Sequence, residues 1–295
     1  MNPEKSAKTI CAYSRSFADF CFSQFWPSAS SVLLLLLVCL PGLAKAEQSG
    51  YWELGAGISY LRSPYYLGSD QSRNYVLPFP HIRVRTEQFS IDRNSLRGHV
   101  LSTDRYKFDV SFSGSIKVDS DDSRLRAGMP DLDYIIEAGP AIKWLLWGEF
   151  NGHDRLTLDV PLRGAMATDF DTAEYIGVNF MPTLHWHKVI YTEGRWTQDH
   201  RLQLRFASRD YHDYLYSVDA AYATAERPAY QASGGFSGWQ YRFTLRHRQN
   251  DRIVGFYIAY SNVVDASYRD SPLVGENYNF SGGILISWVL GKGEL

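Results

Sequence analysis

The chain has a formal net charge of −2. Its 295 residues are enough for one large domain or two small ones. Aromatic residues make up 15% of the sequence, yet the mean hydropathy is −0.28, and after residue 46 no stretch approaches the ~20 apolar residues of a membrane helix. These features argue against a helical membrane protein and a general nucleic-acid binder. They are typical of a β-barrel, in which apolar and polar residues alternate.

Residues 1–46 have the pattern of a secretory signal peptide. Residues 32–40 are apolar, a Pro-Gly pair ends this segment, and Ala44-Lys45-Ala46 matches a small-residue cleavage site. An uncleaved anchor is the alternative, but the apolar segment is short. All three cysteines precede the cleavage site: Cys11, Cys21 and Cys39. We therefore expect residues 47–295 to form a single exported domain without disulfides.

From residue 51 onward, apolar and polar residues alternate with the period of two that is typical of β-strands. In chain order, the expected strands cover 51–61, 75–84, 89–92, 96–101, 106–113, 134–146, 155–166, 176–187, 201–206, 239–246, 254–260 and 278–290. Long loops are expected at 119–133, 210–235 and 265–277. Pro78 and Pro80 place the second strand at an edge, a bulge or a rim, because proline cannot donate to a ladder.

The last strand, Tyr278 to Leu290, carries the clearest signal. One parity is apolar and aromatic, and the other is mostly small and polar. The strand is longer than the ~5–6 residues of a soluble strand and fits a tilted membrane-spanning strand of roughly 9–11 residues plus a rim. A soluble sandwich also alternates. Long strands with large aromatics near their ends favour a membrane barrel instead, because such aromatics form interfacial girdles.

We therefore predict an all-β, antiparallel transmembrane β-barrel in a bacterial outer membrane. Such barrels normally have an even number of strands, with both termini in the periplasm. About 12 strands result if residues 88–101 form a hairpin, and 10 is the alternative. The short turn at 249–251 then faces the periplasm, and the three long loops face outward.

Several motifs occur in order along the chain: Gly55-Ala56-Gly57, 65–70 (YYLGSD), 76–78 (VLP), 119–139, 214–218 (YLYSV), 228–230 (PAY) and 270–274 (DSPLV). Together they resemble the MipA/OmpV family, named for the MltA-interacting protein, over nearly the whole mature chain. The resemblance implies an outer-membrane protein. One member is described as a scaffold that brings a lytic murein transglycosylase to a peptidoglycan synthase, and others as porin-like or antigenic surface proteins.

The remaining candidate sites favour no catalytic chemistry. His185 and His187 share the inward parity and could bind a metal, but no third ligand is identifiable, so polar lumen contacts are the favoured interpretation. The acidic loop at 119–133 lacks calcium-binding spacing, and no G-x-S-x-G nucleophile motif occurs. We expect no enzyme activity, no cofactor and no metal.

The basic side chains that face inward are the best functional lead. The candidate lumen stripe comprises Arg201, Arg205, Arg242, Arg246 and Arg248, and earlier strands add Glu137, Lys143, Asp159 and Arg163. Unpaired arginines around water would favour anions, whereas arginines paired across the lumen would fill it. Buried charges are costly unless they are paired or hydrated, and a barrel of this size has little spare room. A mostly filled lumen is therefore favoured.

The expected function is a non-enzymatic scaffold in the outer membrane, with lipid around it and periplasmic murein enzymes as partners by resemblance. A narrow porin-like channel with a basic lumen is one alternative. A surface-exposed adhesion or antigen protein that uses loops 119–133 and 210–235 is the other.

Overall fold

The computed structural model describes residues 50–85, 89–92, 95–98 and 101–294, so the signal peptide predicted for residues 1–46 lies outside the described residues. The strands are β1 (Tyr51–Pro64), β2 (Ser72–Arg85), β3 (Phe89–Asp92), β4 (Ser95–Gly98), β5 (Leu101–Ser102), β6 (Tyr106–Ser115), β7 (Tyr134–Gly148), β8 (Asp154–Thr168), β9 (Ala173–Phe180), β10 (Thr183–Thr192), β11 (Gly194–Ala207), β12 (Gly235–Gln249), β13 (Arg252–Asn262) and β14 (Tyr278–Glu294). In the described residues, no helix is long and apolar enough to cross a membrane.

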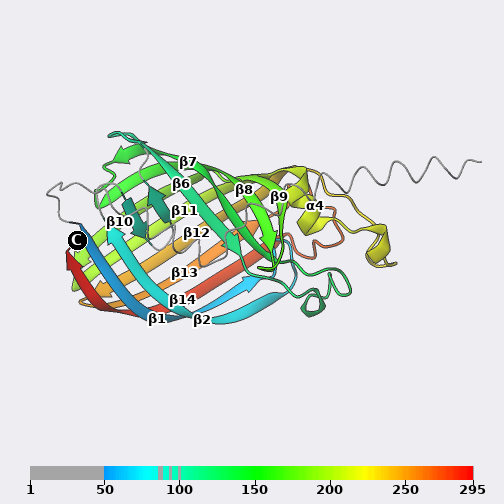
Figure 1. Ribbon diagram of the computed structural model, residues 1–295, viewed down its shortest axis with the longest axis horizontal. Coiled ribbons are helices and arrows are strands. Elements are labelled where there is room, and N and C mark those ends of the chain that lie inside the picture. Colours follow the sequence, from blue (N-terminus) through cyan, green and yellow to red (C-terminus); the bar gives the residue numbers. More distant parts are fainter. Residues whose placement is uncertain (1–49, 86–88, 93–94, 99–100, 295) are drawn as a thin grey trace, which may run out of the picture. The chain divides into compact units, whose positions relative to one another are not determined.

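The strands form one antiparallel sheet (Figure 1). Its order is β4-β3-β2-β1-β14-β13-β12-β11-β10-β8-β7-β6-β5, and β9 pairs with β8 and β11. The first and last long strands, β1 and β14, are paired along most of their length. At the two ends of the strand order, β4 contacts β6. The hairpin predicted within residues 88–101 is present as β3 and β4.

The two faces of the sheet differ as the alternation predicts. On β14, the side chains of Phe280, Ile284 and Leu290 are 71%, 59% and 77% exposed, whereas Leu285 and Ser287 between them are buried. A water-facing surface rarely presents so many large apolar side chains together. They suit the lipid-facing band of a transmembrane β-barrel. The opposite, mostly polar face encloses the interior, which we call the lumen.

The strand predicted at 176–187 is interrupted in the structure. β9 ends at Phe180 and β10 begins at Thr183, with Met181 and Pro182 between them. Proline has no N–H to donate to a ladder, which accounts for a break here. The two segments still occupy one strand position, because β8 and β11 each pair with both of them.

The Gly55-Ala56-Gly57 motif allows β1 and β14 to approach closely. A Cβ atom on Gly55 would collide with the carbonyl oxygen of Trp288, and one on Gly57 with that of Ile286. The pairing register of the two strands also shifts at Gly55. Glycine is the residue that tolerates such an approach, since it has no side chain.

Short turns and long loops lie at opposite ends of the strands. The helix α4 (Arg209–Tyr216) lies with the loops at the end far from the C-terminus (Figure 1). This helix corrects the prediction of an irregular loop at 210–235. Ser208 caps it, because its side chain accepts a hydrogen bond from the Tyr211 N–H. Two single-turn 3₁₀ helices, η2 (Ser120–Asp122) and η3 (Ala220–Tyr222), lie in the same group of loops.

Four of these loops, 65–71, 116–133, 208–234 and 263–277, pack into one structure that we call the cap. Its buried core includes Tyr66, Leu132, Tyr216, Tyr268 and Leu273. The rings of Tyr216 and Tyr268 are stacked with centroids 3.6 Å apart. Because each loop contributes to one apolar core, the cap is an ordered cover over this end of the lumen.

Hydrogen bonds between loops add to this core. The Tyr66 hydroxyl donates to the Leu273 carbonyl over 2.9 Å, and the Tyr216 hydroxyl donates to the Leu67 carbonyl over 2.9 Å. The buried Arg126 guanidinium donates to the Leu215 carbonyl over 3.1 Å. Burial raises the pKa of Tyr66 to about 12, so its hydroxyl keeps the proton that it donates.

His212 of α4 is buried at the centre of the cap. Its Nδ1–H donates to the Ser233 carbonyl over 2.7 Å, and its Nε2 lies 2.7 Å from the Ser237 hydroxyl. One neutral tautomer satisfies both contacts, with Ser237 donating to Nε2. Burial lowers the pKa of His212, because the imidazolium would lose hydration.

We expect a charge on the lipid-facing side to destabilise the protein strongly. Ile284 lies mid-strand, opposite Tyr60 and Phe256. Ile284→Lys should lower the free energy of unfolding by about 2–4 kcal/mol in lipid vesicles, since a lysine would be placed in hydrocarbon. Urea unfolding followed by tryptophan fluorescence measures this, with Ile284→Leu as the matched control. A change within about 0.5 kcal/mol, as on a water-facing surface, would contradict the assignment.

We also expect the cap to loosen in mild acid. The pKa of His212 is lower in the folded than in the unfolded state, so its stabilisation is complete above about pH 6.5 and is lost as pH falls below that value. At pH 5.5 the equilibrium constant for cap opening should rise by up to about tenfold relative to pH 7.5. Hydrogen exchange across residues 208–218 at pH 7.5 and 5.5, corrected for intrinsic rates, measures it. The non-titrating His212→Asn should lose most of this pH dependence, and an unchanged profile would show that another group is responsible.

Candidate functional site

Several acid–base pairs occupy the lumen among the described residues. Arg248 of β12 makes two hydrogen bonds of 2.9 and 2.8 Å to Glu53 of β1, although β13 and β14 separate these strands in the sheet. This bidentate pair therefore crosses the interior. On neighbouring strands, Lys143 lies 3.1 Å from Asp159, and Arg163 lies 3.7 Å from Glu137. Each pair offsets part of the cost of enclosing its charges.

The helix of the cap reaches into this network. The hydroxyl of Tyr211 on α4 donates to Glu137 Oε1 over 2.9 Å. Arg163 also donates to the Ser111 hydroxyl from Nε and from a terminal nitrogen, over 3.0 and 2.8 Å. The strands β6, β7 and β8 and the cap are therefore joined by one set of polar contacts inside the lumen.

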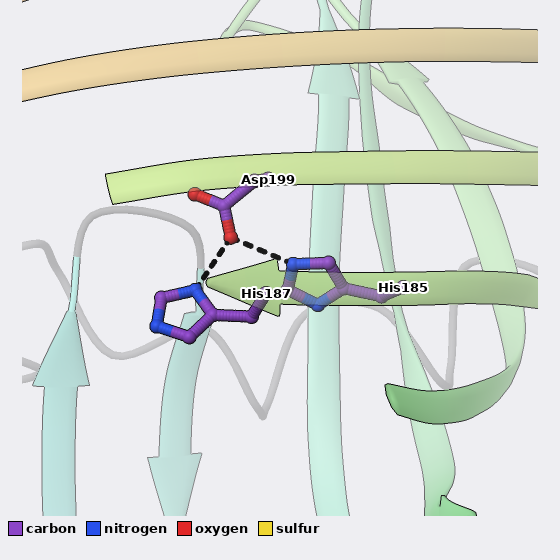
Figure 2. Close-up of side chains that lie close together, drawn as sticks. All are labelled: His185, His187 and Asp199. Carbon is purple, nitrogen blue, oxygen red and sulfur yellow. Dashed lines mark hydrogen bonds and ion pairs between the residues drawn. The ribbon is translucent and has the colours of Figure 1, made fainter. Parts of the chain in front are cut away.

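His185, His187 and Asp199 form a cluster across β10 and β11 (Figure 2). His185 Nε2 and His187 Nδ1 lie 2.8 and 2.7 Å from the same oxygen, Asp199 Oδ1. Because a carboxylate accepts, each imidazole donates an N–H to it. The second oxygen, Asp199 Oδ2, lies 3.5 Å from Arg246. The structure thus supplies the third polar group that the sequence left unidentified.

This cluster is a poor fit for a resident metal. The three donor atoms lie within 4.8 Å of one another, but both facing nitrogens carry the protons that bind Asp199. In each neutral imidazole the lone pair that could bind a metal is on the other ring nitrogen, which faces away from the shared oxygen. Arg246 also competes for the carboxylate. The cluster is better described as a hydrogen-bonded ion network that connects β10, β11 and β12.

Three of the five predicted arginines have no carboxylate within ion-pair distance among the described residues: Arg201, Arg205 and Arg242. Arg201 and Arg242 lie directly opposite each other on β11 and β12. Like charges in such positions repel. Arg242 lies over the ring of Tyr257, with its Cζ 5.2 Å from the ring centroid. The predicted stripe is thus divided, because Arg246 and Arg248 bind acids and the other three do not.

A cavity of about 280 Å³ lies between these arginines and the cap. Arg205 of β11, Arg242 of β12 and Tyr257 of β13 line its lumen side, and Tyr66 and Leu215 line its cap side. The Nε atoms of Arg205 and Arg242 are buried without a protein hydrogen-bond partner. The arrangement can hold a negatively charged group, since Arg205 and Arg242 both line the cavity and guanidinium groups bind carboxylates and phosphates through charge-assisted hydrogen bonds.

The carboxylates of the acidic loop, residues 119–133, make contacts within the loop and to β2. Asp131 accepts a hydrogen bond from the Ser120 N–H over 2.9 Å and lies 3.1 Å from Lys117. These two contacts hold the pKa of Asp131 below its ordinary value. Asp122 pairs with Arg73 of β2 at 3.2 Å. The carboxylates in this loop therefore join the cap to β2 rather than converge on a common cation.

Sequence reasoning missed Glu53 and Asp199 as members of the lumen network. Asp199 was missed because the predicted strand began at 201, whereas β11 begins at Gly194. Extending the alternation backward from Arg201 would have placed Asp199 on the inward face. Glu53 shares the inward parity of β1, but its distant partner Arg248 has no sequence signal.

Comparison with known structures gave distant similarities only. A bacterial polysaccharide outer membrane secretin aligns with a TM-score of 0.39 at 8% identity, over 84% of this chain and all of that one. OccK11 (OpdR) of Pseudomonas aeruginosa aligns with a TM-score of 0.28 at 12% identity, over 84% of this chain and 96% of that one. A Pseudomonas aeruginosa FadL homologue aligns with a TM-score of 0.27 at 6% identity, over 83% of this chain and 90% of that one. These TM-scores are too low to assign a fold or a function. No curated protein matches the sequence.

A family model gives the decisive match. The model described as "MltA-interacting protein MipA" matches residues 54–290, a range that begins within β1 and ends within β14. The motifs at 214–218 and 270–274, which carried the resemblance, lie in the buried core of the cap. The chain therefore belongs to the MipA family, as a β-barrel protein of the outer membrane.

Proposed function

We propose that this protein is a non-enzymatic scaffold of the outer membrane, which binds murein-cleaving or murein-synthesising enzymes at its periplasmic end. The observation that carries the proposal is the cap. A barrel whose outer end is covered by a packed apolar core is built for stability and for presenting surfaces, not for free passage of solutes. The description of the family, which names interaction with MltA, supports the choice of partner.

The arrangement of the lumen agrees with a filled interior. Glu53 and Arg248 join β1 and β12 past the two strands between them, and the cluster around Asp199 occupies the space next to β10 and β11. Charged groups that are paired in this way do not present an open, uniformly basic path for anions. Among the described residues, the surfaces available to a periplasmic partner include the short turns at 149–153, 193 and 250–251, together with the nearby strand ends.

The narrow pore is the second candidate, and the three unpaired arginines favour it. We expect purified, refolded protein to give no steady conductance steps in a planar lipid bilayer, because the cap covers the outer end. Folding is checked by heat-modifiable migration on a gel. Steady steps whose ion selectivity changes in Arg242→Gln would make the pore the primary function and overturn the closed-lumen part of the proposal.

The scaffold itself is tested by binding to a purified lytic murein transglycosylase, MltA. We expect folded protein in detergent to retain the enzyme on an affinity support. The test variant replaces three exposed side chains of the periplasmic turns together: Glu149→Ser, His153→Ser and Asp251→Ser. It should weaken retention about fivefold or more, since a few residues carry most of the binding free energy of an interface.

A matched set of changes on the cap provides the control. Asp219, Thr224 and Glu226 are exposed on the outer side, and changing Asp219 and Glu226 to serine with Thr224→Ala should leave retention unchanged. Equal loss in both sets would show that binding is not specific to the periplasmic end. Absence of retention by the unaltered protein would reject this partner.

A further inference from the structure

The cavity beneath the cap carries an excess of positive charge. Arg205 and Arg242 line it, and Asp133, near the cap, is the one carboxylate among its lining residues. Asp133 lies at no ion-pair distance from either arginine among the described contacts. Arg201 lies opposite Arg242 in the strand register and adds a third positive charge close by. A cavity lined by one sign of charge in this way attracts anions.

Of the two lining arginines, Arg242 is held by contacts to its neighbours. Arg242 lies over the Tyr257 ring and donates to Gln240 Oε1 over 3.4 Å. Its Nε, like that of Arg205, is buried and makes no hydrogen bond to protein. Gln240 is itself bound to the Ser261 hydroxyl over 2.8 Å. Guanidinium groups that are already oriented lose little freedom when they bind a carboxylate or phosphate.

The opposite wall of the cavity has a different character. On the cap side, the lining includes apolar side chains of Leu67, Val118, Leu132 and Leu215. Asn279 also lines the cavity, but both ends of its amide already bind the 65–71 loop, at Gly68 N–H and the Ser69 carbonyl. The lining also includes hydroxyl side chains, among them Ser63, Ser115 and Ser281. A ligand would therefore meet the arginines, further polar groups and the apolar surface of the cap.

We propose that this cavity binds a small organic anion, with a carboxylate or phosphate group against Arg205 and Arg242 and a short apolar body against the cap. A volume of about 280 Å³ corresponds to about nine water molecules at roughly 30 Å³ each. The ligand is therefore a compact molecule of on the order of ten non-hydrogen atoms. Lipid headgroups are excluded as the source, because the site faces the lumen and not the lipid.

The site goes beyond the scaffold function and does not depend on it. A closed lumen with a bound anion requires neither conduction nor a periplasmic partner. The bound anion would neutralise the mutual repulsion of three arginines and would contact the cap, so occupancy stabilises the cap over the lumen. If the anion does not bind, the transglycosylase should still be retained. Anion binding and transglycosylase retention can therefore fail independently of each other.

Isothermal titration calorimetry of the refolded full chain tests the proposal with three probes: phenyl phosphate, inorganic phosphate and benzyl alcohol. We expect phenyl phosphate to bind, inorganic phosphate to bind at least severalfold more weakly, and benzyl alcohol to give no measurable binding. Arg205→Gln and Arg242→Gln should each weaken phenyl phosphate binding about tenfold or more, since each removes a charge-assisted hydrogen bond.

The matched control is Arg269→Gln, which removes an exposed arginine of the cap that lies outside the cavity lining. The affinity of this variant for phenyl phosphate should stay within about twofold of that of the unaltered protein. Heat-modifiable migration verifies that each variant is folded. The proposal is overturned if phenyl phosphate gives no binding at millimolar concentration, if benzyl alcohol binds equally well, or if both cavity variants keep the affinity of the unaltered protein.

Discussion

The pairing of backbone groups between neighbouring strands is the constraint on which the rest of this structure depends. In hydrocarbon, an N–H or C=O group without a partner costs several kcal/mol, so a strand must be paired wherever lipid surrounds it. The long antiparallel ladders of β1 with β2 and β14 meet this requirement. Once the ladders are set, the period of two sends alternate side chains to lipid and to the lumen. The glycines at 55 and 57 allow the first and last long strands to meet without a steric clash.

The lumen then has to accommodate every charge that the inward parity brings to it. Glu53 with Arg248, Asp159 with Lys143 and Glu137 with Arg163 satisfy part of this requirement across or along the strands. Asp199 gathers two histidines and Arg246. Arg201, Arg205 and Arg242 have no carboxylate at ion-pair distance among the described residues, and Arg205 and Arg242 line a cavity of the interior. Partial pairing therefore divides the interior into a filled part and a part that can hold an anion.

The cap links the outer loops to this interior. Tyr211 reaches Glu137 in the lumen, while Tyr216, Tyr268 and Leu273 form the apolar core above it. His212 contacts both the Ser233 carbonyl and the Ser237 hydroxyl as a neutral imidazole, the form that burial favours. The cap is thus a folded unit in its own right, with polar contacts to the strands below. Its order explains why the most specific family motifs lie in loops, where sequence usually varies.

The sequence alone determined the fold class, the side of each strand that faces lipid and the end that carries the long loops, because alternation with a period of two is a local property of the chain. It also placed the inward arginines on consecutive strands. Only the tertiary structure decided which of them are paired, because Glu53 and Arg248 are 195 residues apart and meet through the curvature of the sheet. The joining of four loops into one cap likewise depends on contacts between distant segments, which no local pattern contains. The break at Pro182, in contrast, follows from a local property of proline.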